Sequence, residues 1–274
     1  MTKEPVSTLP QEPALTPSKR RLNAIPTYLR HRAEVYARQP LVRRPRLRLR
    51  FAVFAGVRPG DRVLDVATGP GYNAFAFARR AAVVVGVEAA PELLEIARRE
   101  AARRRLANVT FSEGDPAALQ FPGESFDLIT SAGAVHHFAS PAQVFSEMAR
   151  VAVPGGRVAI EDVVASEQDV RARYHNRLER LRDRSHRRFL PLGELLALLG
   201  RQGLQVRTVQ VQDSLREFNE WVAVTRPPVR RAEHIRRLLQ GSMEQDLSGL
   251  NVQPADDTFL FVQRVAWVLA VKPE

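Results

Sequence analysis

The residues of this 274-residue chain best suited to chemistry surround a glycine-containing turn. Asp65 lies inside the short apolar run 63–66, and Gly69 and Gly71 follow it. Glycine lets the backbone turn sharply after a strand and lets a ligand approach the main chain, because it has no Cβ atom. Glu88 comes directly after the next apolar run. This spacing predicts a cofactor site built from one turn and two carboxylates.

Two classes of cofactor fit this turn. Gly69 to Ala74 satisfies the G-x-G-x-x-G/A pattern of dinucleotide-binding proteins, in which Glu88 would bind the ribose. Asp65, however, would place a negative charge close to the pyrophosphate of a dinucleotide. A buried carboxylate suits a ligand that carries an ammonium or sulfonium group. The residues therefore favour a cationic cofactor, with a dinucleotide as the alternative.

Histidines and carboxylates supply the candidates for proton transfer. His136 and His137 come just after a strand-like segment, and a histidine can hydrogen-bond or deprotonate an acceptor near neutral pH. Glu161 and Asp162 end the following strand-like segment and form a second pair of candidates. The six histidines show no metal-ligand spacing and the chain has no cysteine, so we expect no metal site.

The elements that must position these residues alternate along the chain. The strand-like segments are residues 63–66, 82–87, 109–113, 126–130, 157–161, 204–211 and 259–271. The helix-like segments between them include residues 72–80, 91–106, 141–151 and 192–199. Alternation of this kind predicts an α/β fold with a seven-stranded, mainly parallel, Rossmann-like sheet and helices on both faces.

Two parts of the chain fall outside this alternation. Residues 1–26 are rich in proline and basic residues, which predicts a disordered leader ahead of one domain at 27–274. Segments 27–50, 163–190 and 212–257 interrupt the alternation. We expect them to form a helical cap over the ligand crevice, which lies at the carboxyl ends of the strands.

Charge and hydropathy limit the classes of partner. The net charge is +11, yet residues 1–50 contain twelve basic and three acidic residues and so hold most of it. A basic tail on a near-neutral body is weaker evidence for nucleic-acid binding than a basic patch on the fold. No segment approaches the ~18 consecutive apolar residues of a membrane span, and no apolar signal region follows the N-terminus. We therefore expect a cytoplasmic protein without a membrane span.

In order and spacing, the motifs resemble those of class I S-adenosylmethionine-dependent methyltransferases. The residues that carry the resemblance are Asp65-x-x-x-Gly69-x-Gly71, Glu88, Gly114-Asp115, Phe126-Asp127-Leu128-Ile129 and Val153-Pro154-Gly155-Gly156-Arg157. Within this superfamily, the segment 134–138, which contains both adjacent histidines, is similar to the ubiquinone/menaquinone C-methyltransferase-like group. The resemblance covers about residues 45 to 205.

The resemblance implies that S-adenosyl-L-methionine is the cofactor. Gly69 and Gly71 would contact its methionine part, while Asp65 would order the turn and attract the ammonium group. Ala67 belongs to the same turn and stands where the family usually has glycine or cysteine. Glu88 would accept hydrogen bonds from both ribose hydroxyls.

The remaining implied contacts come from other segments. Asp115 would bind the adenine amino group, and Pro116 would pack near the ring. Ser131 would line the sulfonium, and Tyr36 would close over the cofactor. His186, in the insertion after the fifth strand, would touch the acceptor.

The implied activity is methyl transfer to a small-molecule acceptor, with quinone-like and other aromatic or lipid-like metabolites favoured. His136 and His137 would shape the acceptor pocket or take up a proton. Two alternatives stay open at this point. One is an RNA methyltransferase that uses the basic N-terminus, and the other is a protein that binds the cofactor without catalysis.

Overall fold

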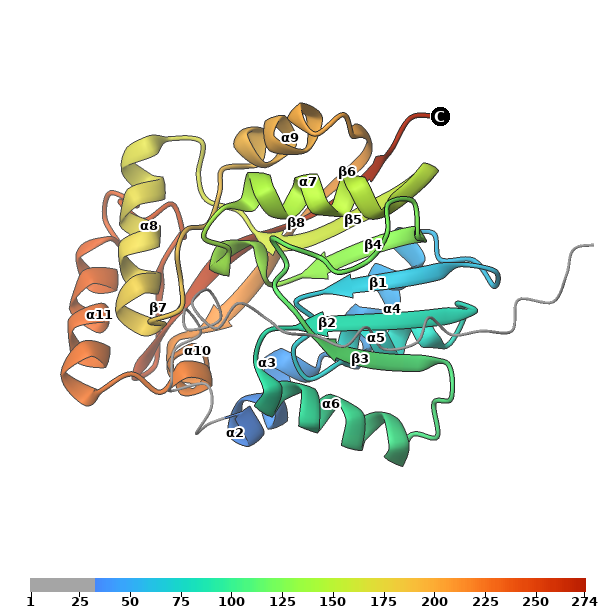
Figure 1. Ribbon diagram of the computed structural model, residues 1–274. Helices are drawn as coiled ribbons and strands as arrows, with labels where there is room; N and C mark the ends of the chain where they lie inside the picture. The colour runs from blue at the N-terminus through green and yellow to red at the C-terminus, as the bar shows by residue number, and fades with distance from the viewer. Residues whose placement is uncertain (1–32) are drawn as a thin grey trace, which may run out of the picture.

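The computed structural model describes residues 33–274, and the expected leader at 1–26 lies outside this range (Figure 1). Its strands form one eight-stranded sheet in the order β3-β2-β1-β4-β5-β8-β6, with β7 paired to β8 off this path. The strands are β1 (Arg62–Val66), β2 (Val83–Glu88), β3 (Val109–Glu113), β4 (Phe126–Ala132), β5 (Ala152–Val163), β6 (Gln205–Glu217), β7 (Gln253–Ala255) and β8 (Thr258–Val271).

The predicted α/β fold with a mainly parallel sheet is confirmed. Strands β1 to β5 run parallel, while β8 is antiparallel to both of its long neighbours, β5 and β6. Seven strands make up the main path of the sheet, as the sequence predicts. The eighth, β7, has only three residues and includes Pro254, so no periodic pattern marks it in the sequence.

Helices cover both faces of the sheet. They are α2 (Ala33–Arg38), α3 (Pro40–Arg43), α4 (Pro45–Phe54), α5 (Tyr72–Ala78), α6 (Pro91–Arg103), the 3-10 turn η2 (Val135–His137), α7 (Pro141–Val151), α8 (Asp169–Arg182), α9 (Leu192–Arg201), α10 (Phe218–Thr225) and α11 (Val229–Gly241). None of these helices is both long and apolar enough to cross a bilayer.

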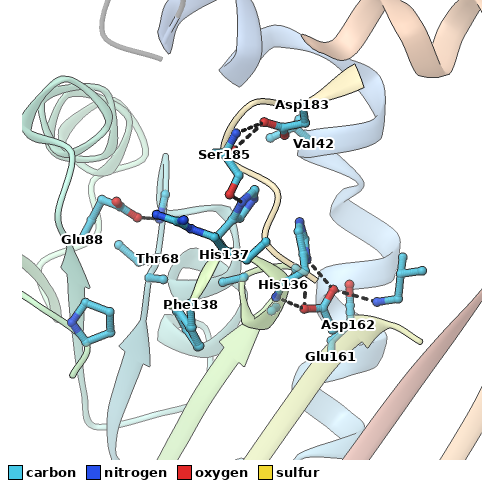
Figure 2. A pocket seen from close by; sticks show the side chains of 18 of the residues that line it. Val42, Thr68, Glu88, His136, His137, Phe138, Glu161, Asp162, Asp183 and Ser185 are labelled. Carbon is cyan, nitrogen blue, oxygen red and sulfur yellow. Dashed lines mark hydrogen bonds and ion pairs between the residues drawn. The ribbon is translucent and has the colours of Figure 1, made fainter. Parts of the chain in front are cut away.

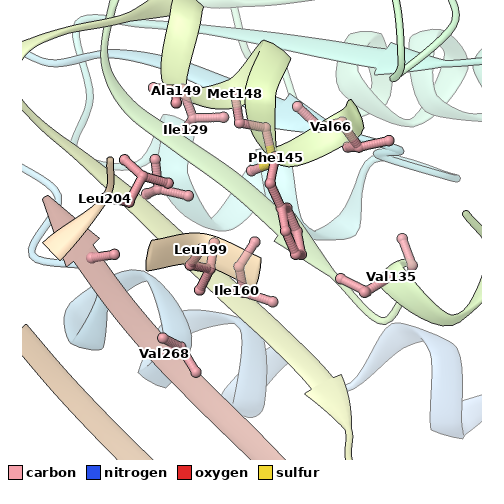
Figure 3. Close-up of a cluster of buried hydrophobic side chains, with 14 of the residues drawn as sticks. Val66, Ile129, Val135, Phe145, Met148, Ala149, Ile160, Leu199, Leu204 and Val268 are labelled. Atoms are coloured by element: carbon pink, nitrogen blue, oxygen red, sulfur yellow. The ribbon is translucent and has the colours of Figure 1, made fainter. Parts of the chain in front are cut away.

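Alternation along the buried strands creates the two apolar layers. Successive side chains of a strand point to opposite faces, so Leu64 packs on one face and Val63 on the other. Helices α7 and α9 cover the first face, where Phe145 and Leu199 pack on Ile160 (Figure 3). Helices α4, α5 and α6 cover the second face.

The two last long strands extend beyond the parallel sheet. Strand β5 ends at Val163, which pairs with Val265, whereas β6 and β8 stay paired as far as Glu217 and Leu260. The predicted strand 204–211 was therefore too short, and residues 212–217 are strand where cap helix was expected. Helices α8, α10 and α11 lie together at this end of the sheet (Figure 1).

Candidate functional site

A cavity of about 750 Å³ lies at the carboxyl ends of the parallel strands. Its lining includes residues at the carboxyl ends of β1, β2, β4 and β5 or just after β3, together with residues of β6, β8, α8 and α10. This position is the usual ligand site of an open α/β sheet, and the volume lies within the ~300–1,000 Å³ of small-molecule sites.

Asp65 organises the turn after β1. The Asp65 carboxylate is buried and accepts hydrogen bonds from Thr68 Oγ1 at 2.6 Å, Asn73 Nδ2 at 2.9 Å and Thr130 Oγ1 at 2.7 Å. Burial raises the pKa of Asp65, and these three hydrogen bonds oppose the rise. The carboxylate therefore ties the turn to α5 and to β4.

The backbone of this turn is left-handed at three positions, with φ of 56° at Ala67, 56° at Gly69 and 81° at Gly71. Ala67 and Gly69 line the cavity, whereas Gly71 does not. A Cβ atom at Gly71 would lie 2.8 Å from the Phe75 ring and 2.9 Å from the Phe111 ring. Gly71 is thus required by close packing behind the turn.

Glu88 joins the ends of β1 and β2 at the cavity. Its Oε2 accepts the Gly69 N–H at 2.9 Å, and its Oε1 accepts the N–H groups of Ala89 at 2.9 Å and Ala90 at 3.1 Å. Burial raises the pKa of Glu88, an effect that these backbone donors oppose. The carboxylate is fixed in place before any ligand arrives.

The other predicted cofactor residues divide into two groups. Tyr36, Asp115 and Pro116 line the same cavity as Glu88. Tyr36 packs on a small apolar cluster with α6, and burial raises its pKa. Asp115 Oδ1 accepts the Ala117 N–H at 2.8 Å. Ser131 is fully buried within β4 and does not line the cavity. The first residue of β4 that does so is the next one, Ala132.

His136 forms a buried pair with Asp162 at the ends of β4 and β5 (Figure 2). His136 Nδ1 lies 2.8 Å and 3.0 Å from the two carboxylate oxygens, and the His136 N–H donates to Oδ2 at 2.9 Å. Burial by itself lowers the pKa of His136, but the Asp162 carboxylate outweighs it and raises the pKa above its ordinary value. Both side chains line the cavity.

The two other predicted histidines differ from His136. His137 lines the cavity, its ring centre 4.0 Å from that of His136, and burial followed by this neighbour lowers its pKa to about 4. His186 is not part of the lining: its Nε2 lies 2.8 Å from Asn176 Oδ1, and its ring packs on Phe189. Burial lowers the pKa of His186 to about 3. The structure thus brings His136 and His137 to the cavity, but not His186.

Several polar residues of the cavity wall were not predicted from the sequence. Arg48 Nη1 lies 3.3 Å from Glu161 Oε1, and Arg182 Nη2 lies 2.7 Å from Glu179 Oε2. Arg216 on β6 also lines the cavity. For Arg182 and Glu179 the only sequence signal was an acid within the arginine-rich helix α8, a pattern also typical of solvated surfaces. Among residues 33–274, no cluster of three or more His, Asp and Glu side chains could hold a metal ion.

The parallel sheet, the acidic turn after its first strand and the cavity at its carboxyl edge define a class I methyltransferase fold. Residues 58–197 match the family model described as a methyltransferase domain. The chain is 34% identical over 181 residues to the uncharacterized methyltransferase YcgJ of Bacillus subtilis, covering 66% of this chain and 72% of that protein. The chain therefore belongs to the methyltransferase family.

Solved structures agree with this assignment. The crystal structure of YcgJ from Bacillus subtilis matches with a TM-score of 0.80 at 29% identity, covering 84% of this chain and 99% of that one. The crystal structure of a putative methyltransferase from Bacillus halodurans matches with a TM-score of 0.79 at 25% identity, covering 83% of this chain and 99% of that one. A demethylmenaquinone methyltransferase of Deinococcus radiodurans is 43% identical over 101 residues, which are 36% of this chain and 42% of that protein.

Proposed function

We propose that this methyltransferase binds S-adenosyl-L-methionine in the cavity and transfers its methyl group to a small-molecule acceptor. The observation that carries the proposal is the meeting of the β1 turn, Glu88 and Asp115 along one side of the cavity. These groups follow β1, β2 and β3, which are neighbours in the sheet. A ligand with an amino-acid part, a ribose and an adenine could therefore contact all three at once.

The residues present fit this cofactor. A carboxylate accepts about four hydrogen bonds, and Glu88 already accepts three from the backbone, so one position on Oε2 is left for a ribose hydroxyl. Both oxygens of Asp65 are engaged with its neighbours, so Asp65 would attract the ligand's ammonium group mainly through its charge. Asp115 would hold the adenine amino group, and Tyr36 would cover the ligand.

The cofactor, when bound, supplies a methyl group that is already activated on a sulfonium. The protein must then hold the acceptor atom about 3–3.5 Å from the methyl carbon, in line with the bond that breaks. Ala132 and Gly133 at the end of β4 line the cavity between the cofactor side and the β5 side. Arg182 and Trp221, from the two cap helices α8 and α10, line the cavity as well and would help to exclude water.

Where the acceptor must lose a proton, His136 is the group placed to take it. Asp162 engages Nδ1, which leaves Nε2 as the nitrogen that can accept a proton from the acceptor. The same carboxylate stabilises the imidazolium that results. His137 stays neutral at pH 7, because its pKa lies at about 4, and therefore shapes the pocket beside His136.

Relatives support a small-molecule acceptor. Besides the demethylmenaquinone methyltransferase, the erythromycin 3''-O-methyltransferase of Saccharopolyspora erythraea is 35% identical over 117 residues, which are 42% of this chain and 38% of that protein. Phe189, Trp221 and Val265 give part of the cavity an apolar wall. RNA as the acceptor depends on the basic N-terminus, of which residues 1–32 lie outside the described range.

The proposal is tested in two measurements. Calorimetric titration should show that the protein binds S-adenosylhomocysteine and does not bind NADH, whereas the reverse result would reject the cofactor. Incubation with S-adenosylmethionine and a fractionated metabolite extract should release S-adenosylhomocysteine and yield a product heavier by one methyl group. Turnover with RNA that falls steeply with salt, and none with metabolites, would favour the RNA alternative.

A further inference from the structure

Two arginines line the cavity on the wall formed by the extension of β6 and β8. Arg216 lies on β6, donates through Nε to Gln263 Oε1 at 2.9 Å, and has a buried Nη1 without a hydrogen-bond partner. Arg44 lies between α3 and α4, and its Nη2 is 3.4 Å from Ser214 Oγ. Ser214 and Arg216 are two residues apart on one strand and so face the same side. The two guanidinium groups therefore belong to one part of the cavity.

Among the described residues, neither of these two guanidinium groups has an ion-pair partner of its own, although Glu161 and Glu179 lie near enough to act on their charge. In the same cavity, Arg48 pairs with Glu161 and Arg182 pairs with Glu179. Within residues 33–274, neither Arg44 nor Arg216 has a carboxylate within ion-pair distance. Burying a cation without an anion is unfavourable, and a bound anion would remove the cost.

The electrostatics of the pair agree with its geometry. Burial, followed by the charge of Arg44, lowers the pKa of Arg216 to about 10. Burial lowers the pKa of Arg44 as well, and Arg48 adds to the effect while Glu161 opposes it. Both arginines remain cations at neutral pH, and each is held near another cation.

The backbone of Arg44 allows a substitution that removes its side chain without straining the chain. Arg44 has φ 33° and ψ 56°, the left-handed region, where it ends α3 and begins α4. Glycine adopts this conformation without strain, whereas a residue with a Cβ atom does not. Unlike the left-handed Arg105, which is exposed and away from the site, Arg44 lines the cavity.

We infer that the acceptor carries an oxyanion group, a carboxylate or a phosphate, which Arg44 and Arg216 bind together. The inference rests on the proposed function, because it places this group in the acceptor part of the same cavity. Trp221 and Val265, which also line the cavity, indicate that an apolar body accompanies the anion. Guanidinium groups bind carboxylate and phosphate oxygens through paired, charge-assisted hydrogen bonds.

The test uses three probes with one apolar body: 1-naphthoate, 1-naphthyl phosphate and the neutral 1-naphthamide. Each is titrated calorimetrically into the full-length protein, with and without saturating S-adenosylhomocysteine. We expect at least one anion to bind about tenfold or more tightly than the amide, which corresponds to one or two charge-assisted hydrogen bonds. The tighter of the two anions identifies carboxylate or phosphate as the natural group.

Two variants and a matched control make the test specific. Arg216→Gln and Arg44→Gly should each weaken binding of the preferred anion about tenfold or more, with the affinity for the amide and for S-adenosylhomocysteine unchanged. Arg44→Gly should also melt at the same temperature as the wild type or higher, because glycine relieves the backbone. Arg105 is another left-handed arginine, with φ 55°, and is exposed at the end of α6. Arg105→Gly should leave anion binding unchanged.

Two results would overturn the inference while the proposed function stands. One is equal binding of the amide and both anions by the wild type. The other is unchanged anion affinity in both Arg44→Gly and Arg216→Gln. Failure of the wild type to bind S-adenosylhomocysteine would instead overturn the proposed function, and the titrations without it would still show whether the two arginines bind an anion.

Discussion

Glu88→Ala gives the sharpest test of how the cofactor is held. Of the ~four lone-pair positions of a carboxylate, three accept the N–H groups of Gly69, Ala89 and Ala90. One position is left, so we expect one strong hydrogen bond to a ribose hydroxyl where the family resemblance implied two. A hydrogen bond to a charged group contributes about 1.5–3 kcal/mol, which is about 13- to 160-fold in affinity.

Substitution of Glu88 also releases three backbone donors, so loss of affinity alone does not isolate the ribose contact. Calorimetry with S-adenosylhomocysteine and with its 2′-deoxy and 3′-deoxy analogues separates the two effects, because disorder of the turn weakens all three ligands alike. We expect the wild type to bind one deoxy analogue about 13- to 160-fold more weakly than the parent ligand. Glu88→Ala should bind that analogue and the parent equally.

Glu95→Ala is the matched control for this cycle. Glu95 is exposed on α6 and does not line the cavity, so its removal changes the net charge by the same amount without touching the site. If Glu88→Ala still distinguishes the analogues as the wild type does, the carboxylate does not bind the ribose. If the wild type loses affinity for both analogues equally, the count of free acceptor positions on Glu88 is wrong.

Three further predictions concern the turn, the buried histidines and the base. Ala67→Gly should raise the free energy of unfolding by up to about 1.5 kcal/mol in chemical denaturation, because a left-handed alanine is strained. As the control, Ala102→Gly at an exposed position of α6 should lower the free energy of unfolding by about 1 kcal/mol. An equal decrease in both variants would show that Ala67 is not strained. Burial lowers the pKa of His175 to about 4, so the unfolded chain binds more protons between pH 6.5 and 4. The free energy of unfolding therefore falls as the pH drops below 6.5. His175→Gln should make this fall between pH 7 and pH 5 smaller by about 2 kcal/mol. A free energy of unfolding that depends on pH as in the wild type would contradict this. Asp162→Asn should lower the pKa of His136 and so shift the acidic limb of the kcat/KM profile to lower pH. For an acceptor that loses a proton, kcat should fall about 10²- to 10⁴-fold, while S-adenosylhomocysteine binding stays unchanged. A profile that keeps its wild-type acidic limb would exclude His136 as the base.

The parallel half of the fold was readable from the sequence because its strands are buried on both faces. Continuous apolar runs such as residues 83–87 leave little choice but a central strand. Helix α7 was predicted at both ends, since Pro141 favours the first turn of a helix. The second half of strand β6 was not predicted, because most side chains of this strand are exposed and its end is mostly polar.

Side-chain direction limited what could be said about the site. The turn and Glu88 follow from spacing alone, since a sharp turn after a strand leaves few places for them. Ser131 and His186 depended on which way a single side chain faces, and the structure buries both away from the cavity lining. The pairing of Asp162 with His136 joins the ends of two strands, and no local pattern carries that information.

The two sides of the cavity have different origins within the chain. Apart from Tyr36, the residues proposed to bind the cofactor lie within residues 58–197, which match the family model. Arg44 precedes that range, and Arg216, Trp221 and Gln263 follow it. The second side is held by buried hydrogen bonds of its own: Gln263 accepts from Arg216 Nε and donates to Glu179 Oε1 at 2.7 Å, which ties β6 and β8 to α8. None of these residues lies on β1, β2 or β3. Substitutions in this wall can therefore alter which acceptor binds without disturbing the turn after β1. The identity of the acceptor should therefore be sought through Arg44 and Arg216, since relatives that share only the matched segment need not share its substrate.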